Sequence, residues 1–230
     1  ALGGGLTARA SVGPAFRIPT FTELYYSDPQ TAGNPDLRPE TATTFEAGLT
    51  WETGPVTFDA AVFHRHGSDL IDFVRSSPSE PFRATNIRTV DTLGLEATLA
   101  LEPAVLARTP VTRVALRAAF YSADLEELRA EAGATEGRYV LDPLRVKWDL
   151  VAEARLPFRV AALARLSWFD RPSFDEGVLL LDARLGYDLL EGDILEVYAE
   201  ADNLGDVRYE EVPGVPLPGR TFAGGVRLTW

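Results

Sequence analysis

The sequence ends on P-G-R-T-F-A-G-G-V-R-L-T-W, residues 218–230, and this stretch has the pattern that the rest of the chain repeats. From Phe222 onward every second residue is apolar or glycine, and the residues between them are small or polar. A period of two is typical of a β-strand with one apolar face. That face could cover a soluble core, or it could contact lipid with the terminal ring of Trp230 at the membrane interface.

The composition excludes several classes of protein and of binding site. The 230 residues include 34 acidic and 22 basic side chains, a net charge of −12, which argues against a nucleic-acid partner. The absence of cysteine excludes disulfides and thiolate metal sites. No run of about 18 uncharged apolar residues is present, so no transmembrane helix is predicted. In strands that alternate apolar and polar residues the two kinds cancel in the overall composition, so the composition fits either a soluble protein or a membrane barrel.

Ten strands are predicted from the alternation. Eight further segments repeat the pattern of the last strand, and residues 2–12 form a weaker candidate. The predicted strands cover residues 2–12, 43–52, 56–63, 93–101, 113–120, 146–155, 160–168, 179–188, 195–202 and 222–230. Most are about 10 residues long, which is enough for a tilted strand to cross a bilayer.

The connections between these strands favour a membrane barrel over a soluble β-sandwich. Short turns are predicted at residues 52–55, 156–158 and 188–193, and long loops at residues 14–39, 75–86, 122–139 and 203–217. The connections at residues 102–109 and 170–177 fit this alternation less well. Prolines in residues 14–39 exclude a central strand there. Outer-membrane barrels have tight turns at one end and long loops at the other.

The positions of aromatic and charged residues agree with a membrane barrel. Trp51, Trp168, Tyr187 and Trp230 fall near strand ends on the apolar face, where an aromatic girdle would lie. Mid-strand charges such as Arg117, Asp149 and Arg184 all fall on the opposite face. An arginine facing lipid at mid-bilayer would cost about 2–4 kcal/mol, whereas a wet lumen would accept it. The predicted fold is therefore all-β, an antiparallel up-and-down transmembrane barrel segment.

Five motifs, in this order along the chain, resemble those of TonB-dependent outer-membrane receptors, and the vitamin B12 and siderophore receptors most of all. They are G-P-A-F-R-I-P-T-F-T-E-L-Y (residues 13–25), G-N-P-D-L-R-P-E (33–40), S-D-L-I-D-F (68–73), N-I-R-T-V-D-T-L-G-L-E-A-T (86–98) and A-D-N-L-G-D-V-R-Y-E (201–210). The terminal strand continues the resemblance, which spans nearly the whole chain.

The resemblance implies a 22-stranded barrel that encloses an N-terminal plug domain, in the outer membrane of a Gram-negative bacterium. Such a receptor takes up siderophore-bound iron or cobalamin with energy from TonB, and it is not an enzyme. The chain would then be one unit, residues 1–230, forming the C-terminal part of the barrel without the plug and earlier strands. In that case we expect the first strand to lack one neighbour. A closed ten-stranded barrel is the alternative.

The resemblance also suggests roles for particular residues. The long loops would face outward. Residues expected to shape the first of them are Arg17, Pro19, Glu23, Asn34, Pro35 and Glu40. Loop residues that could bind a metal chelate are Tyr25, Tyr26, Arg83, Tyr139, Arg208 and Tyr209. Residues similar to the signal read by the barrel-assembly machinery are Phe222, Val226, Leu228 and Trp230.

Catalytic and metal chemistry find little support in the sequence. The two histidines, His64 and His66, share the apolar face near the outer rim, and a metal site would need Asp69 or Asp72 as a third ligand. No hydrolase constellation or phosphate-binding loop is present. We therefore expect no metal and no cofactor. Expected partners are membrane lipid, lipopolysaccharide, the chelate, TonB through the plug, and the assembly machinery. The alternatives are a small stand-alone outer-membrane barrel acting as an enzyme or adhesin, and a soluble β-sandwich that binds a ligand.

Overall fold

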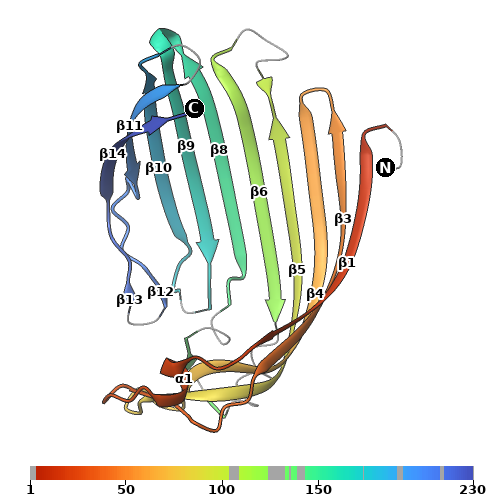
Figure 1. Cartoon of the computed structure of the whole chain (residues 1–230), viewed down its shortest axis with the longest axis vertical. Coiled ribbons are helices and arrows are strands. Elements are labelled where there is room, and N and C mark those ends of the chain that lie inside the picture. The colour runs from red at the N-terminus through yellow and green to blue at the C-terminus, as the bar shows by residue number, and fades with distance from the viewer. Residues whose placement is uncertain are drawn as a thin grey trace.

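A computed structural model describes residues 4–103, 109–123, 133–134, 136–138, 143–172, 174–190, 194–212 and 215–229. Its main sheet follows chain order and pairs each long strand antiparallel to the next (Figure 1). The ten long strands are β1 (Leu6–Arg17), β3 (Glu40–Thr53), β4 (Val56–Arg75), β5 (Phe82–Leu101), β6 (Val111–Ala123), β8 (Val146–Leu156), β9 (Val160–Asp170), β10 (Val178–Asp188), β11 (Leu195–Asp202) and β14 (Thr221–Leu228). The predicted all-β, up-and-down architecture with ten principal strands is confirmed.

Several short elements lie in the connections between the long strands and were not predicted. They are helix α1 (Phe21–Tyr25), β2 (Thr31–Ala32), β7 (Glu136–Gly137), a 3₁₀ turn at Pro157–Arg159, β12 (Glu210–Val212) and β13 (Val215–Pro216). Strand β2 pairs parallel to β5, and β7 pairs with β4. Strands β12 and β13 form a separate hairpin. Residues 124–132, 135 and 139 of the predicted loop at residues 122–139 lie outside the described residues.

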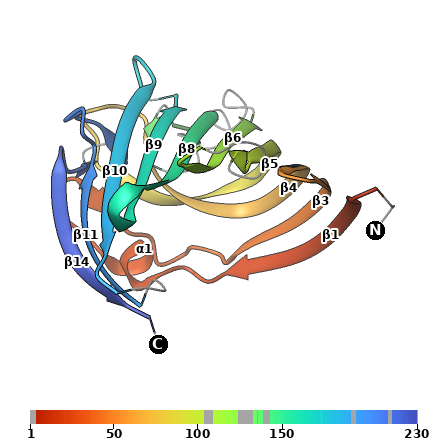
Figure 2. The ribbon, with the colours of Figure 1, turned by 90° about the horizontal axis from the view of Figure 1, so that it is seen from above.

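The sheet curves strongly but does not close on itself (Figure 2). Among the described residues β1 pairs only with β3, and β14 pairs only with β11. The expectation that the first strand lacks one neighbour is therefore confirmed, and the alternative of a closed ten-stranded barrel is wrong for this sheet. Both β1 and β14 leave one row of backbone amides and carbonyls without a strand partner, which a lipid environment does not tolerate.

The face of the sheet that carries the large apolar side chains is the exposed one, whereas in a soluble sheet that face would be buried. We call the face with the alternating apolar side chains the outer row. Its large apolar side chains are exposed: Leu116 by 39%, Leu150 by 43% and Leu166 by 40%. Ala115 and Val151 on the other face, the inner row, are exposed by only 0% and 5%. The inner row is crowded as the concave side of a curved sheet must be. The outer row therefore offers a continuous apolar surface on the convex side, as a lipid-facing wall requires.

Charged side chains of the inner row pair across strands. The Arg9 guanidinium on β1 contacts the Asp59 carboxylate on β4 at 2.6 Å. Glu196 on β11 is buried and accepts ion pairs from Arg184 at 3.0 Å and from Arg227 at 2.9 Å. These contacts put the ionised groups where the sequence predicted them, on the face away from lipid.

Aromatic side chains of the outer row gather near both ends of the strands. We call the two ends the turn end, where the β3–β4 turn lies with both chain termini, and the loop end, where α1 lies (Figure 1). Near the turn end the outer row carries Trp51, Phe58 and Tyr187, and near the loop end it carries Phe120, Trp148 and Trp168. Predicted girdle residue Trp230 lies outside the described residues. The two groups are positioned as the aromatic girdles of a membrane barrel would be.

Strands β4 and β5 continue well past the loop end, so the predicted loop at residues 75–86 is wrong for half of its length, residues 75 and 82–86. Both strands have 20 residues, and only residues 76–81 connect them. At Asp69 the backbone φ is +57°, and residue 69 interrupts the ladder to β5. Beyond this point the hairpin bends away from the wall and lies beneath α1 (Figure 1). We call this part, residues 70–75 and 82–87, the hairpin extension.

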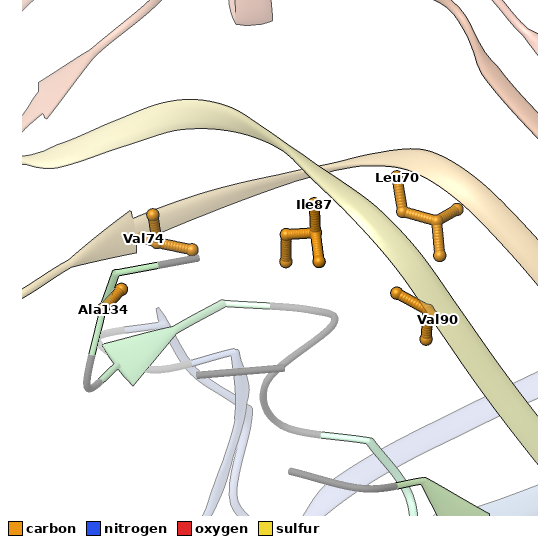
Figure 3. Close-up of a cluster of buried hydrophobic side chains, with 5 residues drawn as sticks. All are labelled: Leu70, Val74, Ile87, Val90 and Ala134. Carbon is orange, nitrogen blue, oxygen red and sulfur yellow. The ribbon is translucent and has the colours of Figure 1, made fainter. Parts of the chain in front are cut away.

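The hairpin extension is packed on both faces, which is why its sequence does not alternate. One face holds a buried cluster of five side chains: Leu70, Val74, Ile87, Val90 and Ala134 (Figure 3). The other face holds Leu37, Ile71, Phe73, Phe82 and Ala84, with Leu24 of α1 packed against them. Apolar residues therefore occur at both parities, and the period of two is lost.

No helix in the described part of the chain is long and apolar enough to cross a membrane.

Candidate ligand-binding site

The loop end is organised by Arg17, the last residue of β1. Its guanidinium donates hydrogen bonds to both carboxylate oxygens of Glu23, at 2.8 and 2.9 Å, and to both carboxylate oxygens of Glu40, at 2.6 and 2.9 Å. The two carboxylates are largely buried, with side chains 12% and 13% exposed, so each depends on the arginine for its charge balance. Glu40 also accepts the backbone N–H of Ile71 at 2.7 Å. These contacts join β1, α1, β3 and the hairpin extension at one point.

Helix α1 begins at this network through a capping box. The Thr20 hydroxyl accepts the Glu23 backbone N–H at 3.2 Å, and the Glu23 carboxylate accepts the Thr20 backbone N–H at 2.6 Å. The spacing Thr-x-x-Glu is a known sequence signal of a helix start, so α1 could have been predicted from residues 20–23. Pro19 directly precedes the cap, where its fixed φ suits the extended approach from β1.

The charge state of Glu23 links this network to pH. Burial raises the pKa of Glu23, but hydrogen bonds from Arg17 and Thr20 outweigh that effect and hold the pKa below its usual value. A lowered folded-state pKa means that the carboxylate stabilises the loop above its unfolded pKa of about 4.3, and that this stability is lost as the pH falls further. Hydrogen bonds to Glu40 and then Glu23 raise the pKa of Arg17, which stays charged throughout.

The segment after α1 is fastened by two asparagines. Asn34 accepts the Asp36 backbone N–H at 2.9 Å, which forms the turn that contains Pro35. Asn86 on β5 bonds the backbone of Arg38 in both directions, at 2.9 and 3.0 Å, and donates to the Asp69 carbonyl at 2.7 Å. The first loop is therefore tied to the bend of the hairpin extension. All six residues that were expected to shape this loop lie in or beside these contacts, and their structural role stays a proposal.

A cavity of about 610 Å³ opens between α1 and the inner face of the sheet. Arg17, Glu23 and Glu40 form one wall, and Leu70, Phe73 and Val90 form an apolar wall. Arg65 on β4 also reaches the cavity, and it has no ion pair within the described ranges. The cavity thus offers one cation beside apolar surface at the mouth of the lumen.

The residues predicted to bind a ligand fall in three places. Tyr25 on α1 is exposed and packs its ring 5.0 Å from that of Phe21. The Tyr26 hydroxyl donates to Asp28 at 2.8 Å, and this hydrogen bond raises the pKa of Tyr26. Arg83 is exposed on the hairpin extension. Tyr139 lies outside the described residues.

Arg208 and Tyr209 lie together in the loop between β11 and β12. They line a cavity of about 400 Å³ with Phe174, Glu176 and Val178. The Tyr209 ring packs edge-on against Phe169 at 5.6 Å between centroids. Burial, followed by the nearby charges of Glu211 and Asp182, raises the pKa of Tyr209, which keeps its hydroxyl a neutral donor. At this cavity the structure brings together two residues that were predicted to bind a ligand, the cationic Arg208 and the aromatic Tyr209.

The comparison with known families settles the class of protein. A family profile described as "TonB dependent receptor-like, beta-barrel" matches residues 2–204. The chain belongs to the TonB-dependent receptor β-barrel family. The resemblance drawn from the sequence motifs is confirmed.

Named relatives and structures of this receptor family agree. The vitamin B12 transporter BtuB of Vibrio vulnificus (strain YJ016) is 31% identical over 97 residues, which are 42% of this chain and 15% of that protein. The copper transporter OprC superposes with a TM-score of 0.69 at 19% identity, over 98% of this chain and 38% of its own. The siderophore receptor PirA from Pseudomonas aeruginosa superposes with a TM-score of 0.65 at 18% identity, and the match covers 98% of this chain and 37% of the PirA chain. At these identities the structures show the shared fold, and this receptor chain spans less than two-fifths of either.

One cluster in this receptor chain differs from the arrangement that the sequence suggested. His64 and His66 approach the same carboxylate oxygen of Asp91, at 3.0 and 2.9 Å. Asp69 instead pairs with Arg38, and the buried Asp72 accepts the Arg138 backbone N–H at 3.1 Å. Asp91 faces His66 across the β4–β5 ladder, a partnership that needs the strand register and is not visible in the linear sequence. In the described part of the chain no cluster of three or more ligating side chains could hold a metal ion.

Sequence reasoning also missed a cationic cluster on the hairpin extension. The guanidinium groups of Arg75 and Arg138 each lie 4.4 Å from the centre of the Phe82 ring. Arg75 pairs with Glu136 at 2.5 Å, while Arg138 donates to the Thr31 hydroxyl at 3.3 Å. Arg138 lies in a predicted loop 56 positions after Phe82 in sequence, so no local signal could have joined them.

Proposed function

We propose that the chain forms the C-terminal part of the transmembrane barrel of an outer-membrane receptor that takes up a metal chelate, either siderophore-bound iron or cobalamin. The observation that carries the proposal is the curved sheet of ten strands with an apolar outer row, a charged inner row and two bare edges. Membership of the TonB-dependent receptor family supports the same role. The bare edges of β1 and β14 support an assembly in which further strands complete the wall.

The remaining parts of the receptor follow from this proposal. Energy would come from TonB through a plug domain of the full receptor, and the Gram-negative outer membrane would be its location. The family consists of receptors and transporters, which speaks against an enzyme. Residues Phe222, Val226 and Leu228 lie on the outer row of β14, and with Trp230 we propose them as the signal for barrel assembly.

We propose that the chelate is bound at the loop end by residues from separate loops. Tyr25 and Tyr26 would contribute from the first loop, Arg83 from the hairpin extension, Tyr139 from the third loop, and Arg208 with Tyr209 from the last. The Arg208–Tyr209 cavity is the strongest candidate because a cation, a neutral phenol and an apolar lining meet there. Aromatic and arginine side chains in such pockets contribute most to binding energy at interfaces.

Uptake by the full receptor tests this proposal. In a strain that lacks its own receptors for these ligands, expression should restore uptake of one labelled chelate from a panel that contains ferric siderophores and cobalamin. Substitution of Tyr209→Ala should then weaken binding of that chelate about tenfold, which is about 1.4 kcal/mol. Arg220→Ala, an exposed arginine close to β14, serves as the matched control. Restoration of no chelate in the panel would count against the uptake role.

A further inference from the structure

Arg65 on β4 differs from the other basic side chains of the inner row. Most of them pair with a carboxylate: Arg9 with Asp59, Arg17 with Glu23 and Glu40, Arg113 with Glu153, Lys147 with Asp149, Arg155 with Asp188, and Arg184 and Arg227 with Glu196. Arg117 and Arg165 make no ion pair in the described part of the chain, but each faces an aspartate across the ladder. Arg65 makes none there either, and it faces the neutral Thr44 and Thr92. Arg65 is exposed, so its N–H donors are available to a ligand.

The carboxylates in the cavity of about 610 Å³ beneath α1 are already engaged. Both oxygens of Glu23 and both oxygens of Glu40 accept hydrogen bonds from Arg17. The backbone N–H groups of Thr20 and Ile71 add one more hydrogen bond to each carboxylate. One arginine and two carboxylates leave this network a net negative charge, but the charge is held by these donors. Among the described side chains that line the cavity, a ligand therefore meets no free carboxylate.

The groups that remain for a ligand are one cation, two hydroxyls and an apolar wall. Arg65 lines the cavity together with the hydroxyls of Thr22 on α1 and Thr92 on β5. The apolar wall contains Leu70 and Val90, which belong to the buried cluster of the hairpin extension (Figure 3). Because the cluster already holds these side chains in place, a ligand would not need to order them. The cavity volume lies in the range of about 300–1,000 Å³ that is usual for small-molecule sites.

The cavity lies between the outer loops and the lumen. Thr22 lines it from α1, and Tyr25, a candidate chelate-binding residue, follows three positions later on the same helix. The register places Arg65 level with Ala123, the last residue of β6, at the loop end of the wall. A chelate that passes α1 on its way into the barrel therefore meets Arg65 at the mouth of the lumen.

We propose that Arg65 is a specificity-determining residue of the receptor and that it selects an iron chelate with a net negative charge. The inference rests on the proposed function, because it takes the ligand to be a metal chelate, and it names which of the two chelate classes is carried. Anionic oxygens of the chelate accept hydrogen bonds from the Arg65 guanidinium, whose planar fork of N–H groups matches paired oxygens. The body of the chelate lies against Leu70 and Val90. Ferric catecholates and ferric citrate have such oxygens and a negative charge, whereas a neutral ferric hydroxamate and cyanocobalamin have no net charge.

Equilibrium binding to the purified full receptor in detergent tests the charge of the ligand. The probes are a ferric tris-catecholate, ferric citrate, a neutral ferric tris-hydroxamate and cyanocobalamin. We expect one anionic probe to bind at least tenfold more tightly than either neutral probe, and to lose affinity as the salt concentration rises. Tightest binding of a neutral probe, or binding of neither anionic probe, would overturn the inference and leave the uptake role standing. Binding of an anionic probe by a receptor that restores no uptake would count against the proposed function alone.

Substitution of Arg65 tests the residue itself. Arg65→Gln removes the charge and the fork of N–H donors, so the Kd of the anionic probe should rise about tenfold or more and its salt dependence should weaken. Arg165→Gln is the matched control, because it changes another inner-row arginine without an ion pair in the described ranges, in the middle of β9, and it should bind as the wild type does. Both variants should run as a compact band on an unheated gel, since neither side chain faces lipid. An unchanged Kd in Arg65→Gln, or an equal loss in both variants, would overturn the role given to Arg65.

Discussion

The substitution Leu166→Arg should largely prevent folded receptor from accumulating in the outer membrane. Leu166 lies in the middle of β9 on the outer row, between Leu150 on β8 and Leu181 on β10. An arginine there would face hydrocarbon and cost about 2–4 kcal/mol at the bilayer midplane. The folded fraction can be measured from the mobility of unheated samples on a gel and from urea unfolding in lipid vesicles.

The matched control is the same change three residues earlier in the same strand. Leu163 belongs to the inner row, where it faces Glu153 and Arg184 and lines a cavity of about 170 Å³. An arginine at this position would lie in a polar lumen beside a carboxylate, so Leu163→Arg should accumulate close to the wild-type level. Equal loss in both variants would show that volume and not lipid exposure controls the result.

The second large effect is expected for Arg17→Met. The change leaves the buried carboxylates of Glu23 and Glu40 without their cation, and uncompensated buried charges cost roughly 3 kcal/mol when a partner is removed. Because the arginine is itself partly exposed, the lower part of the usual range applies. Hydrogen exchange should therefore accelerate about 100-fold in residues 18–39 and at the backbone N–H of Ile71, while strands β8 to β11 stay unchanged.

The acid behaviour of the same loop provides the control. In the wild type, exchange in residues 18–39, corrected for the intrinsic rate, should rise as the pH falls below about 4 because Glu23 then becomes protonated. In Arg17→Met, Glu23 loses the hydrogen bonds and the charge of Arg17, which help to lower its pKa, so the rise should begin at a higher pH. A wild-type and variant loop with the same exchange at pH 7 would contradict the role given to Arg17.

The wall of the barrel could be predicted from sequence because each membrane strand has one environment on each face. Lipid selects apolar residues at one parity and the lumen selects mostly polar or small residues at the other, so segments such as residues 146–155 and 179–188 have an apolar residue at every second position. The long and short connections then fix which end is which. Ten strands and their order follow from these two signals alone.

The loop end could not be predicted in the same way, because its contacts are not periodic. In residues 70–74 apolar side chains fall at both parities, with only Asp72 between them, since both faces of the hairpin extension are covered, and a period of two therefore disappears. The sequence predicts a loop from Pro14, yet Pro14 lies inside β1, which is at the edge of the described sheet, where a strand tolerates a missing donor. Partnerships such as Arg138 with Phe82 join distant segments and depend on the completed fold.

Single-cysteine labelling along β9 tests the central claim most directly, since the chain contains no natural cysteine. Cysteines placed at residues 163, 165, 166 and 168 of the receptor in lipid vesicles would be reacted with a membrane-soluble and a water-soluble thiol reagent. The structure predicts that positions 166 and 168 react with the membrane-soluble reagent and that positions 163 and 165 are shielded from it. The reverse pattern, or labelling of positions 166 and 168 by the water-soluble reagent alone, would contradict a lipid-facing outer row.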